Sequence, residues 1–203
     1  MKLKIVGLII VALVMAACNA VENDSTSGSM LEIVSLTGKD LEGKEGSTTV
    51  FSDVIFNGSI INDNGSAEVK AAPLDPFLPD TEITSYMSVM VDQIDVEFRR
   101  TDGRNIEGVD VPYHFTQPVS MLVSLAASVK IPFVLIRHVA KLEAPLLALR
   151  DQSQEFFLEL VAVVTIHGKD LGGHRVAPVT GYITVWCGNF PDVKKTGTGS
   201  TAK

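Results

Sequence analysis

Cysteine is nearly absent from this chain of 203 residues, which contains only Cys18 and Cys187. Two cysteines cannot build the set of disulfides that holds many small secreted domains together. Aromatic residues make up 6% of the chain and charged residues 20%, whereas apolar residues make up 46%. The fold must therefore rest on a large aliphatic core, which a domain of about 150 residues can bury without a disulfide or a metal. The sparse charge also indicates a surface patch that meets another molecule, with a wholly buried core as the alternative.

Positive charge is in deficit as well. The 17 Lys and Arg residues are outnumbered by 24 Asp and Glu residues, so the formal net charge is −7. Because nucleic acids are bound through excess positive charge, this balance indicates that no nucleic acid is a partner.

The chain also lacks the short motifs that mark common active sites and cofactor sites. It has no Gly-x-Ser-x-Gly nucleophile elbow, no His-Glu-x-x-His zinc motif and no Cys-x-x-Cys-His haem motif. No cysteine or close acidic pair completes a zinc site with the histidines, which are His114, His138, His167 and His174. We therefore expect no catalytic residue, no cofactor and no metal.

Short strand patterns, separated by Gly, Pro, Asn and Asp clusters, fill most of the chain. No alternation of strands with helices occurs, so the predicted fold class is all-β: an antiparallel two-sheet β-sandwich with about seven strands. A short helix within residues 139–149 is compatible with the pattern, whereas prolines exclude a longer one. The expected strands lie within residues 31–36, 48–56, 83–100, 119–126, 131–136, 155–167 and 175–187.

Some of these segments support finer predictions. In residues 83–100 the apolar positions change from odd to even near Asp92 and Gln93, which indicates a β-bulge or a crossing between the sheets. Residues 131–136 are apolar on both faces and are predicted to form a central strand. The last two segments are predicted to form the closing hairpin.

Residues 57–80 interrupt the strand pattern and form the predicted binding loop, with a short added strand at 67–71 as an option. An EF-hand loop starting at Asn62 would need a glutamate at the position of Pro73, so an ordinary Asn-Gly turn is the preferred interpretation. The candidate binding residues are Asn62, Asp63, Asn64, Asp75 and Phe77.

The first eighteen residues are organised like a secretory signal. Lys2 and Lys4 form a basic head, residues 5–17 are an unbroken apolar run, and Ala-Ala-Cys18 ends it. The run is too short for a membrane-spanning helix, which needs about 20 residues. The segment resembles the signal peptide and lipobox of bacterial lipoproteins. The alternatives are an ordinary secretory signal with a chance cysteine, or a membrane-anchoring helix.

The lipoprotein resemblance implies that residues 1–17 are removed, that the Cys18 sulfur carries a diacylglyceryl group, and that the new amino group is acylated. Several acyl chains give a stable attachment to a membrane, so Cys18 is the expected anchor. Asn19 replaces the aspartate that is associated with inner-membrane retention, which weakly favours the outer membrane if the source is Gram-negative. With Cys18 lipidated, Cys187 has no disulfide partner, and its apolar surroundings predict a buried thiol.

We expect the mature chain to begin with a flexible tether at residues 18–30, continue as the sandwich domain at 31–190 and end in a disordered tail at 191–203. The strand spacing and closing hairpin resemble immunoglobulin-like domains of bacterial envelope proteins. The cysteine pair that links the sheets of antibody domains is absent, so the resemblance implies no particular strand order.

Together these features predict a lipid-anchored module of the cell envelope that is not an enzyme. We expect it to act as a binding or structural module through contacts with another envelope protein. The alternative is a carrier of an apolar ligand, in which part of the aliphatic surplus lines a cavity. An envelope hydrolase is a third interpretation.

The anchor can be tested directly. Because the thioether forms at the cysteine sulfur, Cys18→Ala should abolish incorporation of labelled fatty acid and change the processing of the chain. Cys187→Ala is the control and should be labelled as fully as the wild type. Undiminished labelling of the Cys18→Ala protein would contradict the lipoprotein interpretation.

Overall fold

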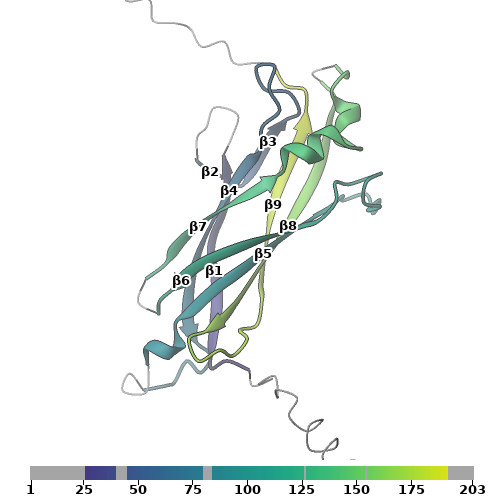
Figure 1. Cartoon of the computed structure of the whole chain (residues 1–203). Coiled ribbons are helices and arrows are strands. Elements are labelled where there is room, and N and C mark those ends of the chain that lie inside the picture. The colour runs from purple at the N-terminus through teal and green to yellow at the C-terminus, as the bar shows by residue number, and fades with distance from the viewer. Residues whose placement is uncertain (1–25, 40–44, 80–83, 126, 154, 192–203) are drawn as a thin grey trace, which may run out of the picture.

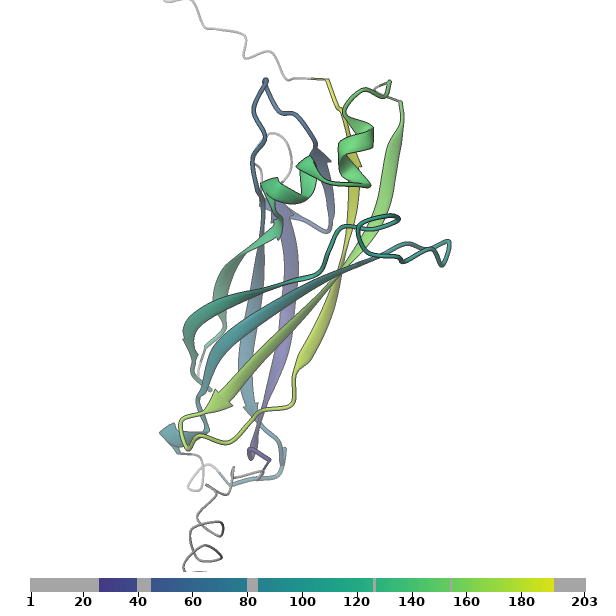
Figure 2. The same cartoon turned by 45° about the vertical axis from the view of Figure 1, so that its right-hand side comes forward.

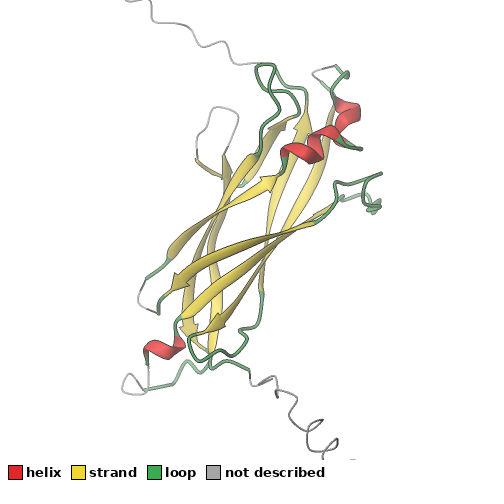
Figure 3. Cartoon of the chain, in the orientation of Figure 1, coloured by secondary structure: helices red, strands yellow, loops and turns green. Residues whose placement is uncertain are grey.

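The structure, a computed structural model, describes residues 26–39, 45–79, 84–125, 127–153 and 155–191. The predicted signal peptide, Cys18 and most of the predicted tail lie outside these ranges. Over the described residues the chain forms nine β-strands and three short 3-10 helices (Figures 1 and 3). The strands are β1 (Ser29–Lys39), β2 (Glu45–Ser47), β3 (Thr49–Asp53), β4 (Asp63–Pro73), β5 (Val89–Arg99), β6 (Phe115–Val123), β7 (Val129–Ile136), β8 (Phe157–Asp170) and β9 (Val179–Gly188). The helices are η2 (Ser85–Met87), η3 (His138–Leu142) and η4 (Leu146–Leu149).

The strands build two sheets, which confirms the predicted all-β class. A four-stranded sheet has the order β2-β1-β4-β7, and a five-stranded sheet has the order β3-β9-β8-β5-β6. Neighbouring strands are antiparallel except β3 and β9, which are parallel. The hairpin of β8 and β9 is present as predicted.

The prediction of about seven strands is wrong, because β2 falls in a segment that reads as a turn and β4 falls in the predicted loop 57–80, where a strand at 67–71 is only an option. β4 occupies the middle of the expected loop, with Ala67, Val69 and Ala71 buried on one face. Gly65 marks a close approach rather than a turn: a Cβ placed there would lie 2.4 Å from the Phe133 ring. The glycine therefore leaves room for the end of the Phe133 ring against the backbone of β4.

The expected β-bulge is present in β5. The register of β5 with both of its neighbours shifts between Val91 and Gln93. Val89 and Val91 before the shift are buried, and Ile94 and Val96 after it are buried too. The extra residue thus keeps the apolar side chains of both halves on the core face.

β7 is an edge strand, so the prediction of a central strand at 131–136 is wrong. Its consecutive apolar residues are explained by the end of the strand, where Leu135 and Ile136 are both buried just before the chain turns into η3. Pro132 lies in β7, and Pro118 lies in β6, an edge strand of the five-stranded sheet. A proline has no N–H to offer a further strand and is therefore tolerated at a sheet edge.

The fold begins before residue 31, where the sequence places the end of the tether. β1 starts at Ser29, and the side chains of Ser27 and Ser29 are buried. The backbone N–H of Ser27 donates to the Arg175 carbonyl at 3.1 Å, and the Ser29 hydroxyl donates to the Met87 carbonyl at 2.7 Å.

Leucine truncation tests where the core lies. Leu135 in β7 and Leu160 in β8 are both fully buried, so we expect Leu135→Ala and Leu160→Ala each to lower the free energy of unfolding by about 2 to 5 kcal/mol. The exposed Lys169→Ala should change it by no more than about 0.5 kcal/mol. Urea unfolding of the chain 19–203 provides the measurement. Wild-type midpoints for both leucine variants would contradict this assignment of the core.

Candidate functional site: a groove at the open edge of the sandwich

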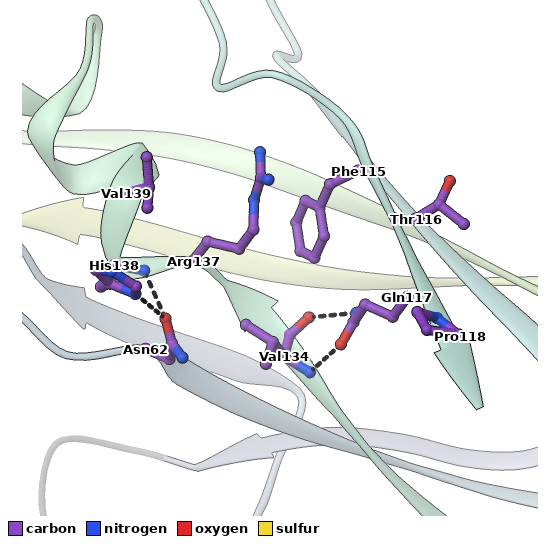
Figure 4. Close-up of a pocket in the computed structure, with 9 residues that line it drawn as sticks. All are labelled: Asn62, Phe115, Thr116, Gln117, Pro118, Val134, Arg137, His138 and Val139. Carbon is purple, nitrogen blue, oxygen red and sulfur yellow. Dashed lines mark hydrogen bonds between the residues drawn. The ribbon is translucent and has the colours of Figure 1, made fainter. Parts of the chain in front are cut away.

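The two sides of the sandwich are closed in different ways. On one side only Thr48 separates β2 from β3, so the chain passes directly from the four-stranded sheet to the five-stranded sheet. On the other side β6 and β7 are the edges of different sheets and share no ladder (Figure 1). This open edge contains a groove of about 270 Å³ (Figure 4). Its lining residues are Asn62, Phe115, Thr116, Gln117, Pro118, Val134, Arg137, His138 and Val139.

Gln117 bridges the two edges at the floor of the groove. Its Nε2 donates to the Val134 carbonyl at 2.8 Å, and the Val134 N–H donates to its Oε1 at 2.7 Å (Figure 4). The side-chain amide of β6 thus makes the pair of bonds that a neighbouring strand would make to β7. The bridge joins the sheets at one position and leaves the groove open beside it.

Arg137 follows the last residue of β7 and lies along the groove. Its guanidinium carbon is 4.4 Å from the centroid of the Phe115 ring, the geometry of a cation–π contact. Its Nε is buried and has no hydrogen-bond partner. No carboxylate lines the groove, and no ion pair to Arg137 forms among the described residues.

The far wall of the groove is fixed by Asn62. Its Oδ1 accepts a hydrogen bond from the His138 backbone N–H at 2.6 Å and another from His138 Nδ1 at 3.0 Å (Figure 4). Because Nδ1 donates here, it carries a hydrogen, and the ring orientation is set. The loop before β4 and the start of η3 are thereby held together.

A buried ion pair lies behind this wall. The Lys141 side chain in η3 is fully buried, and its Nζ lies 3.0 Å from each carboxylate oxygen of Asp63. The same Nζ donates to the Asp53 carbonyl at 2.7 Å, and the Ser52 hydroxyl donates to Asp63 Oδ2 at 2.6 Å. Burial raises the pKa of the Asp63 carboxyl more than the Lys141 charge and these hydrogen bonds lower it. The pair joins η3 to β3 and β4 and so positions the residues that precede it.

Cys187 lies close to this cluster and is a free, buried cysteine, as the sequence predicts. Burial, together with the Asp63 charge, raises the pKa of its thiol to about 12. The residue is therefore a packing element of β9 rather than a nucleophile.

The structure divides the candidate binding residues between the two ends of β4. Asn62 lines the groove, Asp63 holds Lys141, and Asn64 is exposed at the start of β4. At the other end Asp75 Oδ1 accepts a hydrogen bond from the Phe77 N–H at 2.9 Å, and Phe77 is 90% exposed. The five residues therefore do not form a single loop.

Phe115, Gln117 and Arg137 contribute to the groove without having been found from the sequence. Gln117 lies in no alternating pattern, and its role depends on a strand that belongs to the other sheet. Arg137 did leave a signal, since it is the first charged residue after the apolar run 131–136. A single cation at that position usually marks only the end of a strand.

The histidines do not assemble a metal site among the described residues, where no group of three or more suitable side chains is found. Three of them pair singly with carboxylates on other surfaces: His114 with Glu107, His167 with Asp95 and His174 with Asp170.

Comparison with family models, curated proteins and solved structures gave no match to this chain. Within the residues that the structure describes, no helix is long and apolar enough to cross a membrane.

Removing the buried cation should destabilise the fold in a pH-dependent way. Lys141→Met leaves the Asp63 carboxylate buried without its counter-charge, so we expect a loss of about 3 to 5 kcal/mol at pH 8. The raised pKa of Asp63 means that the folded state takes up a proton on that group at a higher pH than the unfolded state does. The loss should therefore become smaller as the pH falls from 8 to 5.

Urea unfolding at both pH values measures this difference. Lys169→Met, which removes an exposed lysine, is the matched control and should have little effect at either pH. An equal loss at pH 5 and pH 8 for Lys141→Met would mean that lost packing, not the unpaired carboxylate, causes the destabilisation.

Proposed function

We propose that this protein is a lipid-anchored binding module of the cell envelope and that the groove between β6 and β7 contacts a partner protein. The observation that carries the proposal is the groove itself, with the Arg137 guanidinium, which forms no ion pair with any described residue. The Arg137 guanidinium, held against Phe115 in a preformed groove, is suited to contact a group on a partner protein. In this proposal the module has no catalytic role.

The position of the groove supports this function. Ser29, where β1 begins, pairs with Pro73 at one end of β4, whereas Ile136, next to Arg137, pairs with Asp63 at the other end. Ten steps of about 3.3 Å along β4 separate these ends by about 33 Å. Figures 1 and 2 show the start of β1 and the helices η3 and η4 at opposite ends of the elongated domain. An anchor at Cys18 would therefore present the groove away from the membrane.

The size of the groove favours contact with a protein over uptake of a whole small ligand. Sites for small molecules usually enclose about 300 to 1,000 Å³. The groove of about 270 Å³ lies at the lower end of that range and suits one or two side chains of a partner. This observation ranks the module above the second candidate, a carrier of an apolar ligand.

We also propose that the domain is a variant of the immunoglobulin-like sandwich. Support comes from its two mainly antiparallel sheets and from the closing hairpin of β8 and β9. The two sheets together have nine strands among the described residues, two more than the seven that the sequence predicts. The outer membrane remains the proposed location if the source is Gram-negative.

Site-specific photocrosslinking in intact cells tests the function. A photoreactive phenylalanine analogue at Val139, which lines the groove and is 40% exposed, should form a discrete adduct with an envelope protein. The same analogue at Tyr182, 66% exposed on the five-stranded sheet, is the control and should not form that adduct. The adduct should also disappear when Cys18→Ala removes the anchor.

Identical adducts at both positions, or none at Val139 while the protein is present in membranes, would contradict the proposal. Recovery of a small apolar molecule with the purified protein, displaced by Val139→Trp, would instead favour the carrier.

A further inference from the structure

We infer that Arg137 binds a carboxylate group of the partner protein, an acidic side chain that enters the groove with apolar neighbours on either side. The inference rests on the proposed function of the groove and specifies the chemistry that the groove recognises.

An anion is indicated because the guanidinium has no carboxylate partner among the residues that the structure describes. The Nε of Arg137 is buried without a partner, although a buried donor normally has one. Arg99, Arg100 and Arg104 each pair with a carboxylate at 2.6 to 2.9 Å. Arg137 differs from them because it lies in a groove with no carboxylate among the lining residues. Nε itself is covered, but Arg137 as a whole is only half-buried, so an incoming carboxylate would accept hydrogen bonds from the Nη groups of the planar guanidinium.

The guanidinium is held in place before any ligand arrives. Stacking at 4.4 Å on Phe115 fixes one face of the planar group. The backbone that carries it is fixed by the Gln117 bridge to Val134 on one side and by the Asn62 bonds to His138 on the other. Less side-chain freedom is therefore lost when an anion binds.

Backbone pairing of a peptide strand along β7 is a poor alternative. The N–H and C=O of Val134 are already used by Gln117, and the N–H of His138 donates to Asn62. Pro132 offers no N–H, and Pro118 interrupts the facing edge in the same way. A further strand therefore cannot pair with this edge, whereas a side chain of a partner can enter the groove.

A carboxylate matches the groove better than a phosphate does. One guanidinium supplies a single positive charge, whereas a phosphate near neutral pH carries about −1.5 to −2. The formal charge of the chain is −7, so no general attraction would neutralise the surplus. The apolar surfaces of Phe115, Val134 and Val139 also suit a carboxylate that is carried on a hydrocarbon body.

Nuclear magnetic resonance titration of the 15N-labelled chain 19–203, which retains every described residue, tests the inference. The probe is 3-phenylpropionate, a carboxylate on an apolar body, and the reporter is the Nε–Hε resonance of Arg137, assigned by its loss in Arg137→Gln. We expect a saturable shift of this resonance with 3-phenylpropionate. The uncharged 3-phenylpropanol should leave it unshifted, and inorganic phosphate should bind more weakly than the carboxylate.

Three variants test whether a loss of binding comes from the lost guanidinium of Arg137 or from a general change in charge. Arg137→Gln should weaken binding, followed on the Val134 and Val139 amides, by at least about tenfold, the loss expected for hydrogen bonds to a charged group. Arg137→Lys keeps the charge without the planar fork and should recover only part of the affinity. The exposed Arg175→Gln removes the same charge elsewhere and should leave the affinity within about twofold of the wild type.

Equal shifts with the acid and the alcohol, stronger binding of phosphate, or an affinity unchanged by Arg137→Gln would each overturn the inference. Crosslinking from Val139 distinguishes this failure from failure of the proposed function. An adduct that persists at full yield in Arg137→Gln would reject the carboxylate contact and keep the groove as an interface. Carboxylate binding without any adduct in cells would reject the proposed function and keep the site.

Discussion

The buried ion pair between Lys141 and Asp63 is the contact on which the groove depends. A fully buried lysine side chain destabilises a fold unless an opposite charge pairs with it. The Nζ of Lys141 lies 3.0 Å from each carboxylate oxygen of Asp63, which supplies that charge. Lys141 lies in η3, while Asp63 is the first residue of β4, so the pair locks the helix to the four-stranded sheet. Asn62, the preceding residue, then meets His138 at the start of the same helix. Two consecutive residues thus position one wall of the groove.

The second constraint is the unequal closure of the sandwich. One side is closed covalently, since β2 and β3 belong to different sheets and are joined through Thr48. The other side depends on Gln117, whose amide satisfies the backbone of Val134 as a strand would. Prolines in β6 and β7 keep these two edges from recruiting a foreign strand. In the proposed function this edge therefore contacts a partner through side chains and not by strand addition.

The sequence predicts what depends on local patterns and misses what depends on contacts between the sheets. Alternation of apolar residues predicts the all-β class, the β8–β9 hairpin and the bulge near Gln93, because each follows from the two-residue period of a strand. Asn64-Gly65 is a strong turn signal and predicts a turn at the start of β4, with a strand at 67–71 only as an option. In the structure Gly65 lies within β4 and leaves room for the Phe133 ring. Of the groove-lining residues, only Asn62 is among the candidate binding residues that the sequence suggests. Gln117 and Arg137 acquire their roles from residues of other strands, which no local pattern encodes.

The single buried thiol is consistent with the envelope location that the N-terminal segment predicts. If Cys18 is lipidated, Cys187 is the only thiol left in the chain. The thiolate is the form that attacks disulfides and is oxidised, and a pKa of about 12 keeps it scarce at neutral pH. Full burial in β9 also keeps oxidants away from the sulfur. In the proposed envelope location Cys187 is therefore protected from oxidation, and in the proposed function the partner contacts the Arg137 guanidinium of the groove rather than a nucleophile.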